Sequence, residues 1–300
     1  MKNKNKINRE KKNLTTSGWS DYELLDSGNK KKLERYGSYH LIRFEPEATW
    51  KPSYKKRVWD STDAEFTLSK GERTGLWTFR SKLKPSWSIT IDKLHVVLNI
   101  SKSRHIGIFP EQLENWRWIE KKINRSKKEV NILNLFGYTG IASLFAARAG
   151  AHVTHIDSSQ KAMELGKRSL SLSGLAGKPV RWLVDDASKF IKREIRRGRK
   201  YDGIIMDPPN FGRGPKGEIW NFNHSITNLL TLCGELLTND PILFIITAYN
   251  VDHSPTELSL WLQNLMNIFY GKIEYGNLIQ QEKSSGRKIH QAIYARWSSL

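Results

Sequence analysis

Residues 134–157, NLFGYTGIASLFAARAGAHVTHID, read as a buried strand, a glycine turn, a helix of small residues and a second buried strand that ends in an acid. Gly137 and Gly140 lie where the first strand turns into the helix, so the backbone can approach a ligand without a Cβ in the way. The helix N-terminus there offers unpaired N–H groups. Asp157 ends the second strand, where a carboxylate can accept hydrogen bonds from both ribose hydroxyls. The stretch therefore predicts a ligand that contains a nucleoside.

The spacing of the glycines indicates which ligand this is. A dinucleotide-binding pattern G-x-G-x-x-G that begins at Gly137 would need glycine where the chain has Thr139 and Ala142. The missing glycines are those that let a backbone close on a pyrophosphate, which S-adenosylmethionine lacks. The pattern therefore favours S-adenosylmethionine over NAD. A glycine turn with a capping aspartate and no ligand is the simpler alternative.

A pair of acids ends the third expected strand, in RWLVDDASKF. Asp185 or Asp186 can accept a hydrogen bond from an adenine amine while the backbone of Ala187 contacts the ring. Either acid can equally cap the N-terminus of the helix that follows, since aspartate is a favoured N-cap. We expect one of the two to be a cap.

The fourth expected strand ends in a rigid turn, in YDGIIMDPPNFGRGPKG at residues 201–217. Pro208 and Pro209 stop the strand ladder and stiffen the turn. Asp207, or a carbonyl beside it, can then accept a hydrogen bond from a planar amine or ring nitrogen. Phe211 can stack on an extruded base. A plain turn can contain D-P-P by chance, but this one shares the sheet edge predicted for Gly137 and Asp157.

The chain divides into three parts that differ in residue composition and hydrophobic pattern. Residues 1–18 are polar and lack periodicity, so we expect a disordered basic arm. Residues 19–103 contain short strand-like runs, YELLDSG, SYHLIRFEP, GLWTFR, WSITID and LHVVLNIS, which predict a small, mostly β N-terminal domain. Residues 104–300 alternate strands and helices after a connecting helix that starts near Pro110, which predicts an α/β domain with a mostly parallel, Rossmann-like sheet. The last two strand-like runs flank a glycine turn and predict a closing C-terminal β-hairpin.

Composition bounds the setting and the partners. The 300 residues carry a net charge of +19, and the excess is spread over both N-terminal and C-terminal parts. Such a charge favours a polyanionic partner such as RNA, with a solvated basic surface as the alternative. No apolar run is long enough to span a membrane, the first residues do not resemble a secretory signal, and the single Cys233 cannot form an internal disulfide. We therefore expect a cytoplasmic protein without a membrane partner.

The basic stretches and the histidines each allow a functional and a structural role. The run at residues 192–200 can contact phosphate or can be a solvated helix end, where cations are favoured in any case. Near the N-terminus, GNKKKLERYG and SYKKRVW suit RNA contacts, although their aromatic residues can equally fill a β core. The eight histidines show no metal-ligand spacing, so no metal is expected, and His152 and His155 are expected to be structural.

Taken together, NLFGYTG, HID, VDDA and DPPNF resemble the motifs of class I S-adenosylmethionine-dependent methyltransferases. GIFPEQ before LNLFGYTG, followed by DPPNFGRG, is similar to the family that contains bacterial large-subunit rRNA methyltransferases acting on cytosine C5 or guanine N7. The resemblance implies a cofactor site made of Asn134, Phe136, Gly137, Tyr138, Thr139, Gly140, Asp157, Ser158, Asp185, Asp186, Ala187 and Asp207. It implies a methyl-transfer site made of Asp207, Pro208, Pro209, Asn210 and Phe211. It also implies that residues 105–112 cover cofactor or target, although Glu-Gln stands here where several relatives carry Asp-Gln-Arg.

The cysteine content favours one branch of this chemistry. Methylation of a pyrimidine at C5 requires a nucleophile, normally a thiolate, and relatives that do it carry cysteine at the end of the fifth strand or beside the fourth-strand proline. Here those positions hold Thr247-Ala248-Tyr249 and Pro208-Pro209-Asn210, and Cys233 sits at an apolar helical position. The sequence therefore predicts direct transfer to a base nitrogen of RNA, ribosomal RNA first. A protein or small-molecule methyltransferase, or a cofactor-binding protein without catalysis, is the alternative, and no oligomeric state is predicted.

Overall fold

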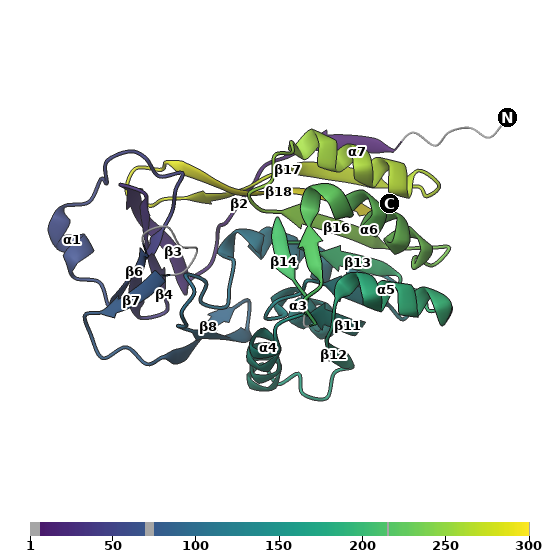
Figure 1. Ribbon diagram of the computed structural model, residues 1–300, viewed down its shortest axis with the longest axis horizontal. Coiled ribbons are helices and arrows are strands. Elements are labelled where there is room, and N and C mark those ends of the chain that lie inside the picture. The colour runs from purple at the N-terminus through teal and green to yellow at the C-terminus, as the bar shows by residue number, and fades with distance from the viewer. Residues whose placement is uncertain (1–6, 70–74, 215, 300) are drawn as a thin grey trace.

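The computed structural model describes residues 7–69, 75–214 and 216–299. Figure 1 shows two lobes side by side, an N-terminal β lobe and a larger lobe built on a nine-stranded sheet. The long strands β17 and β18 run from the larger lobe to the N-terminal one (Figure 1).

The centre of the large sheet is parallel. Its strands follow the order β16-β13-β10-β11-β12, so the order reverses at β10. This strand leads into the glycine turn at Gly137. The side chains of β13 and β16 are buried throughout, as expected for a sheet covered on both faces. These strands are β10 (Asn131–Leu135), β11 (His152–Asp157), β12 (Val180–Val184), β13 (Gly203–Met206) and β16 (Leu243–Ala248). The expected Rossmann-like sheet is confirmed.

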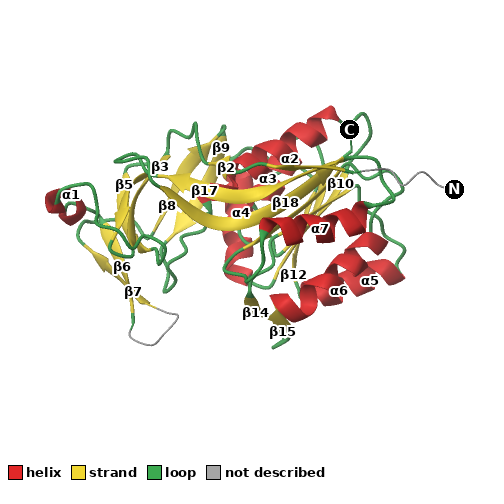
Figure 2. Cartoon of the chain, turned by 90° about the horizontal axis from the view of Figure 1, so that it is seen from above, coloured by secondary structure: helices red, strands yellow, loops and turns green. Residues whose placement is uncertain are grey.

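Helices cover this sheet on opposite faces, with α2 and α3 on one and α5, α6 and α7 on the other (Figure 2). Several begin at a side-chain cap, such as Ser159 before α4 and Ser254 before α7, where Glu257 completes a capping box. The connecting segment forms a 3₁₀ turn at Pro110–Gln112 and then a helix, as expected. The helices are α2 (Leu113–Arg125), α3 (Ile141–Arg148), α4 (Gln160–Leu172), α5 (Ala187–Arg196), α6 (Phe222–Glu235) and α7 (Pro255–Met266).

The predicted closing hairpin is present as β17 (Lys272–Gln281) and β18 (Lys288–Ser298). It pairs antiparallel to β16 through β18. The expectation of a disordered arm is wrong for residues 7–18, because β1 (Asn8–Lys11) and β2 (Leu14–Thr15) pair in parallel with β17. Ile7 and Leu14 anchor this segment with 5% exposure each. The β1 side chains are all exposed, so no periodicity marks the strand. Residues 1–6 of the expected arm lie outside the described residues.

The N-terminal lobe contains a five-stranded sheet and a separate hairpin. All the strand-like runs expected there form strands, and β4 and β6 are additional. The strands are β3 (Tyr22–Gly28), β4 (Lys31–Tyr36), β5 (Tyr39–Phe44), β6 (Ala64–Leu68), β7 (Gly75–Phe79), β8 (Ser86–Ile91) and β9 (Leu94–Asn99), with the short helix α1 (Lys56–Asp60). The β8–β9 hairpin packs on α4 and shares a hydrophobic core with α3. A division of the chain at residue 103 stays a prediction.

Buried polar contacts join the two lobes. Glu34 on β4 accepts hydrogen bonds from the Arg43 guanidinium, with Nε at 2.7 Å, and lies inside the lobe. Lys32 donates to Gln280 of β17 at 3.2 Å, and Gln291 of β18 donates to Glu45 at 2.7 Å. Within the basic and aromatic run around β4, Lys32 and Tyr36 are therefore buried in a core or at the junction between the lobes, whereas Lys30 is exposed.

Among the helices that the structure describes, none is long and apolar enough to cross a membrane.

Candidate functional site

The loop between β10 and α3 has an unusual backbone. Phe136 and Tyr138 adopt left-handed conformations with φ of 54° and 51°, and Gly140 has φ of 77° where α3 begins. Each such non-glycine residue costs on the order of 1–3 kcal/mol and persists only where its surroundings hold it. Strained backbone of this kind clusters at ligand sites. The loop that the sequence singled out is therefore a rigid, constrained turn.

A buried histidine on the neighbouring strand β11 is hydrogen-bonded to this loop. His155 on β11 is fully buried, and its Nε2 donates to the Tyr138 carbonyl at 3.2 Å. Its Nδ1 therefore accepts from the Ser143 hydroxyl at 3.0 Å, and that hydroxyl accepts from Asn134 Nδ2 at 2.9 Å. Burial lowers the pKa of His155 to about 3, so the ring stays neutral. The structural role expected for His155 is confirmed. Asn134 is connected to the loop by hydrogen bonds that pass through Ser143 and His155.

The structure gives a reason for Gly137 in addition to the ligand approach expected from the sequence. A Cβ on Gly137 would overlap the His155 ring, with Nδ1 only 2.6 Å away, and would lie 2.9 Å from Asn134 Nδ2. A Cβ on Gly140 would meet Trp182 at 2.6 Å. The glycines thus allow close packing of the loop on β11 and β12, in addition to supplying the left-handed conformation at Gly140.

Asp157 lies at the end of β11 beside this loop. Its Oδ2 accepts from the Tyr138 amide at 2.7 Å, and its Oδ1 accepts from the Ser159 amide at 2.8 Å. Each oxygen keeps a second lone pair for a further donor. Burial is the main cause that raises the pKa of Asp157. With Ser158 and Phe136, Asp157 lines a cavity of about 40 Å³.

The two acids after β12 have separate partners. Asp186 is the N-cap of α5 and accepts from the Lys189 amide at 2.8 Å, which answers the question left open by the sequence. Asp185 forms an ion pair with Arg193. Both acids and Ala187 line the same cavity as Asp157. An adenine contact by Asp186 stays a prediction.

Asp207 directly follows β13, which lies between β10 and β16 in the sheet. Its carboxyl accepts a hydrogen bond from the hydroxyl of Thr247, the penultimate residue of β16. Burial, with smaller contributions from Glu111 and Asp157, raises the pKa of Asp207 to about 7. The side chain lines a cavity of about 60 Å³ together with Asn134, Phe136, Gly137, Tyr138 and Thr139. Phe136 also lines the cavity beside Asp157, so the two spaces meet at this loop.

The turn after Asp207 is tied down by its own backbone. The Pro209 carbonyl accepts from Trp220 Nε1 at 2.6 Å, and the Asn210 carbonyl accepts from the Phe222 amide at 2.9 Å. Within the described chain, the Pro208 carbonyl has no donor. Asn210 donates to the Asn250 carbonyl at 2.6 Å.

Only part of this turn lines the two cavities. Phe211 begins the β14 (Phe211–Arg213) and β15 (Ile219–Asn221) hairpin and is 45% exposed. Pro209 lines the cavity beside Asp157, whereas Pro208, Asn210 and Phe211 line neither cavity. Stacking of Phe211 on a base stays a prediction.

The segment before α2 contributes polar groups whose contacts could not be read from the sequence. Gln112 donates to the Thr247 hydroxyl at 3.2 Å and to the Tyr249 hydroxyl at 3.1 Å. Thr139 of the loop donates to the Gly107 carbonyl at 2.7 Å. The segment therefore lies against both the loop and the end of β16. Its motif marked it as a cover, but the partners of Gln112 are more than a hundred residues away along the chain.

These residues fit S-adenosylmethionine. Asp157 has acceptor positions left for ribose hydroxyls, and the cavity beside it is bordered by the acids after β12. The second cavity continues under the loop to Asp207. No group of three or more metal-ligating side chains occurs among the described residues. His152 faces outward and pairs with Glu129.

Comparisons with known proteins find S-adenosylmethionine-dependent methyltransferases. A family model described as S-adenosylmethionine-dependent methyltransferase matches residues 72–247. The solved S-adenosylmethionine-dependent methyltransferase from Agrobacterium tumefaciens is 38% identical, superposes with a TM-score of 0.93, and is matched over 98% of this chain and 96% of that chain. A methyltransferase solved with SAH, SMU.776, shares the fold at 18% identity and a TM-score of 0.68, over 94% of this chain and 76% of that chain.

The curated relatives carry more specific names. Ribosomal RNA large subunit methyltransferase K of Neisseria meningitidis is 25% identical over 280 residues, which cover 91% of this chain and 76% of that protein. Ribosomal RNA large subunit methyltransferase I of Alteromonas mediterranea is 28% identical over 190 residues, 63% of this chain and 45% of that protein. The chain spans less than half the length of several further relatives that it matches.

Fold, site and family model define a class I methyltransferase with S-adenosylmethionine as its cofactor. The chain belongs to the S-adenosylmethionine-dependent methyltransferase family.

Proposed function

We propose that this enzyme methylates a base nitrogen of RNA, with ribosomal RNA as the first candidate, by direct transfer and without a covalent cysteine intermediate. The observation that carries the proposal is the carboxyl of Asp207. It lies at the end of β13 in the cavity under the cofactor loop, with a pKa of about 7. The net charge of +19 and the names of the relatives support RNA as the substrate. We expect the activity in the cytoplasm.

The position of the only cysteine supports transfer to nitrogen. Cys233 lies in α6 with no exposed surface and packs in the apolar core beside Leu229 and Leu230. Burial raises the pKa of its thiol well above its ordinary value, so a thiolate does not form there. The strand ends beside the cofactor loop hold Thr247 and Pro208 instead. A covalent route to C5 of a pyrimidine therefore lacks its nucleophile.

The chain's own residues would bind and orient the reactants. S-adenosylmethionine supplies an activated methyl group when bound. The loop at residues 136–140, Asp157 and the residues after β12 would hold it. The Asp207 carboxylate and the Pro208 carbonyl would accept hydrogen bonds from an N–H of the target base, and at neutral pH Asp207 can also accept a proton. Asn210 would brace this turn through Asn250, and Phe211 would contact the base. Positioning supplies most of the rate enhancement in such a reaction.

Methyl incorporation tests the proposal. Purified enzyme is incubated with labelled S-adenosylmethionine and RNA from a strain that lacks the gene, and modified nucleosides are identified by mass spectrometry. We expect a base methylated at nitrogen, present in wild-type RNA and absent from the deletion strain. Label confined to protein or small-molecule fractions would contradict an RNA substrate. A 5-methylpyrimidine product would contradict transfer to nitrogen.

A further inference from the structure

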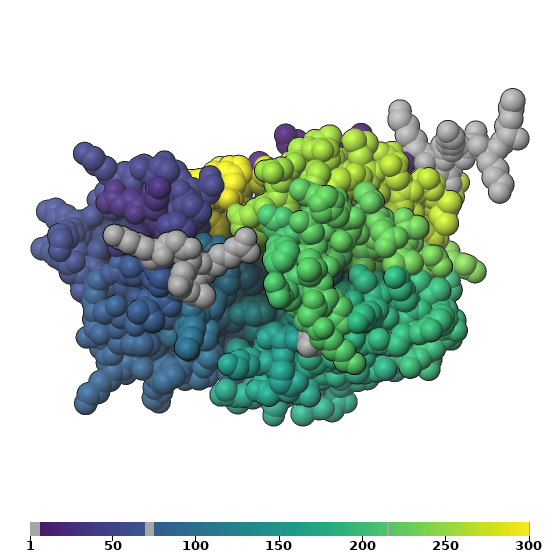
Figure 3. Space-filling model, in the orientation of Figure 1, coloured from purple at the N-terminus to yellow at the C-terminus, as the bar shows by residue number. Residues whose placement is uncertain are grey.

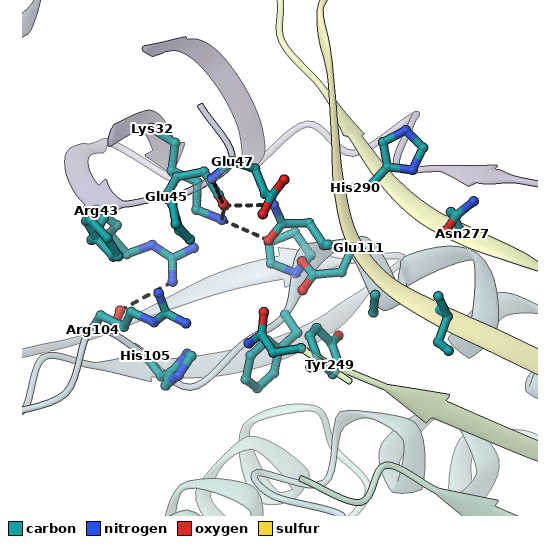
Figure 4. A pocket seen from close by; sticks show the side chains of 18 of the residues that line it. Lys32, Arg43, Glu45, Glu47, Arg104, His105, Glu111, Tyr249, Asn277 and His290 are labelled. Atoms are coloured by element: carbon teal, nitrogen blue, oxygen red, sulfur yellow. Dashed lines mark hydrogen bonds and ion pairs between the residues drawn. The ribbon is translucent and has the colours of Figure 1, made fainter. Parts of the chain in front are cut away.

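A second and larger cavity, of about 240 Å³, lies between the two lobes. It is lined by β4, β5, the segment from Arg104 to Glu111, the end of β16 and β18 (Figure 4). Figure 3 shows the surface hollowed where the N-terminal lobe meets the larger one. Ile108 and Phe109 line both this cavity and the one that contains Asp207. A group bound here would therefore lie directly beside the methyl-transfer site.

Among the described residues that line the cavity, Arg104 is a cation with no acidic side chain in contact. Lys32 pairs with Glu45 at 3.5 Å, and Arg43 pairs with Glu34 at 2.7 Å. The Arg104 guanidinium forms no hydrogen bond or ion pair within the described residues. The backbone carbonyl of Arg104 accepts a hydrogen bond from Arg43. Burial and the nearby Arg43 lower the pKa of Arg104, although Glu45 and Glu111 oppose this shift, so its charge is held at a cost. An anion bound at Arg104 would relieve that cost.

Aromatic rings form one wall of the cavity. The ring of Phe109 lies 5.1 Å from that of His105 and 5.4 Å from that of Tyr249, measured between centroids. Burial and the two arginines lower the pKa of His105 to about 3, so the imidazole is a neutral planar group. Neutral aromatic faces are the surfaces on which single-stranded nucleic acids stack their bases.

A carboxyl group also lines the cavity. Glu111 lines the cavity while only 3% of its surface reaches solvent. Gln280 donates to its Oε2 at 3.0 Å. Carboxyl oxygens have room for further donors, and the amino groups of guanine, adenine and cytosine are such donors. Uracil has no amino group and presents carbonyl oxygens on both sides of its N–H.

We propose that this cavity receives one nucleotide of the RNA substrate, with Arg104 bound to a phosphate, the His105–Phe109–Tyr249 rings against the base, and Glu111 accepting from an amino group of the base. The inference rests on the proposed function and names the residues that select the nucleotide. Arg104 and Glu111 lie on the segment that precedes α2, and the cavity is completed by β4 and β5. The N-terminal lobe is therefore part of the substrate site.

Binding of free nucleotides tests the proposal apart from catalysis. The full chain is saturated with S-adenosylhomocysteine, and binding of the four ribonucleoside 5′-monophosphates and of guanosine is measured by ligand-detected NMR. We expect Arg104→Ala to weaken binding of the monophosphates about tenfold, since a charge-assisted contact contributes at least about 1.5 kcal/mol. It should change guanosine binding less than about twofold, and Arg104→Lys should retain part of the affinity.

The base edge is tested with Glu111→Gln. In the wild type we expect the uridine nucleotide to bind most weakly, and Glu111→Gln to remove this difference. Arg57→Ala, which removes an exposed arginine on α1, is the matched control and should bind like the wild type. Unchanged calorimetric affinity for S-adenosylhomocysteine shows that each variant is folded.

The outcomes separate this inference from the proposed function. Nucleotide binding that depends on Arg104 in an enzyme that does not methylate RNA would support the cavity and overturn the function. RNA methylation unaffected by Arg104→Ala would support the function and overturn the cavity. Absence of saturable binding of all four monophosphates up to about 10 mM, the weak end of measurable affinity, would also overturn the cavity.

Discussion

The hydroxyl of Thr247 donates a hydrogen bond to the carboxyl of Asp207 across the ends of the neighbouring strands β16 and β13. The bond favours the ionised carboxylate, whereas burial raises the pKa of Asp207 to about 7. The Asp207 carboxyl therefore titrates in the range where the enzyme would work. Two predictions follow from this contact, one for the carboxyl and one for its donor.

Asp207→Ala is expected to lower kcat by about a hundredfold or more, the usual scale for loss of a positioned proton acceptor, while cofactor affinity stays within about twofold. In the wild type, kcat should rise as the pH increases through about 7, because the carboxylate is the active form. The contribution of Asp207 to the free energy of unfolding changes with pH in the opposite direction to kcat. Its raised pKa means that the folded chain binds the proton more tightly, so this contribution falls as the pH rises towards about 7. Normal turnover by Asp207→Ala would show that the acid is not part of the transfer site.

Thr247→Val removes the donor and keeps the shape of the side chain. Because the hydrogen bond lowers the pKa of Asp207, its loss should move the midpoint of the pH–rate profile to higher pH. Thr247→Ser keeps the hydroxyl and should restore the wild-type midpoint. An identical profile in all three enzymes would mean that Asp207 does not control the rate.

Gly137→Ala is expected to weaken cofactor binding at least about tenfold and to destabilise the fold by about 1–3 kcal/mol, because the new methyl group would overlap the buried His155 ring. Calorimetry with S-adenosylhomocysteine and thermal unfolding measure the two effects. Gly177→Ala is the matched control, since no atom lies within 4 Å of the position of its Cβ. Equal affinities in both variants would contradict the role assigned to loop packing.

Asp186 offers a test of capping against cofactor contact. Asn is as good an N-cap as Asp, so Asp186→Asn should leave the melting temperature nearly unchanged, whereas Asp186→Ala should cost about 1 kcal/mol. If Asp186 also contacts the adenine, both variants should weaken binding of S-adenosylhomocysteine. A loss of stability in the alanine variant alone, with normal binding in both, would leave Asp186 as a cap.

Cys233→Ala is expected to leave kcat unchanged and to cost about 1 kcal/mol of stability, because it removes one buried atom from the core around α6. The comparison is made with the methyl-incorporation assay at a temperature where both enzymes are folded. A large loss of activity in a folded variant would revive a thiolate mechanism.

The sheet and the main site motifs were predictable because their signals are local. Strands such as β13 are continuous apolar runs, and Gly137, Asp157 and Asp207 each stand where such a run ends. Strand β1 was not predictable, since all its side chains are exposed and its partner is far away in the chain. Strand β4 was hidden because Lys32 and Glu34 are buried charges that become acceptable only through Glu45 and Arg43.

The contacts of Gln112 could not be predicted from the sequence either, because its partners are distant along the chain. Its partners Thr247 and Tyr249 join it only when the end of β16 is placed against the segment before α2. Asp186 shows the intermediate case, in which the sequence offered two roles for neighbouring acids and backbone geometry selected the cap.

The pairing of β1 with β17 has a consequence for how the chain is made. Asn8 lies opposite Lys272, so β1 has no partner during synthesis until β17 has also been translated. Contacts between such distant segments form late and slow the completion of folding. We expect nascent chains stalled before residue 272 to leave the N-terminal segment open to proteases, and its protection to mark the moment when the sheet is complete.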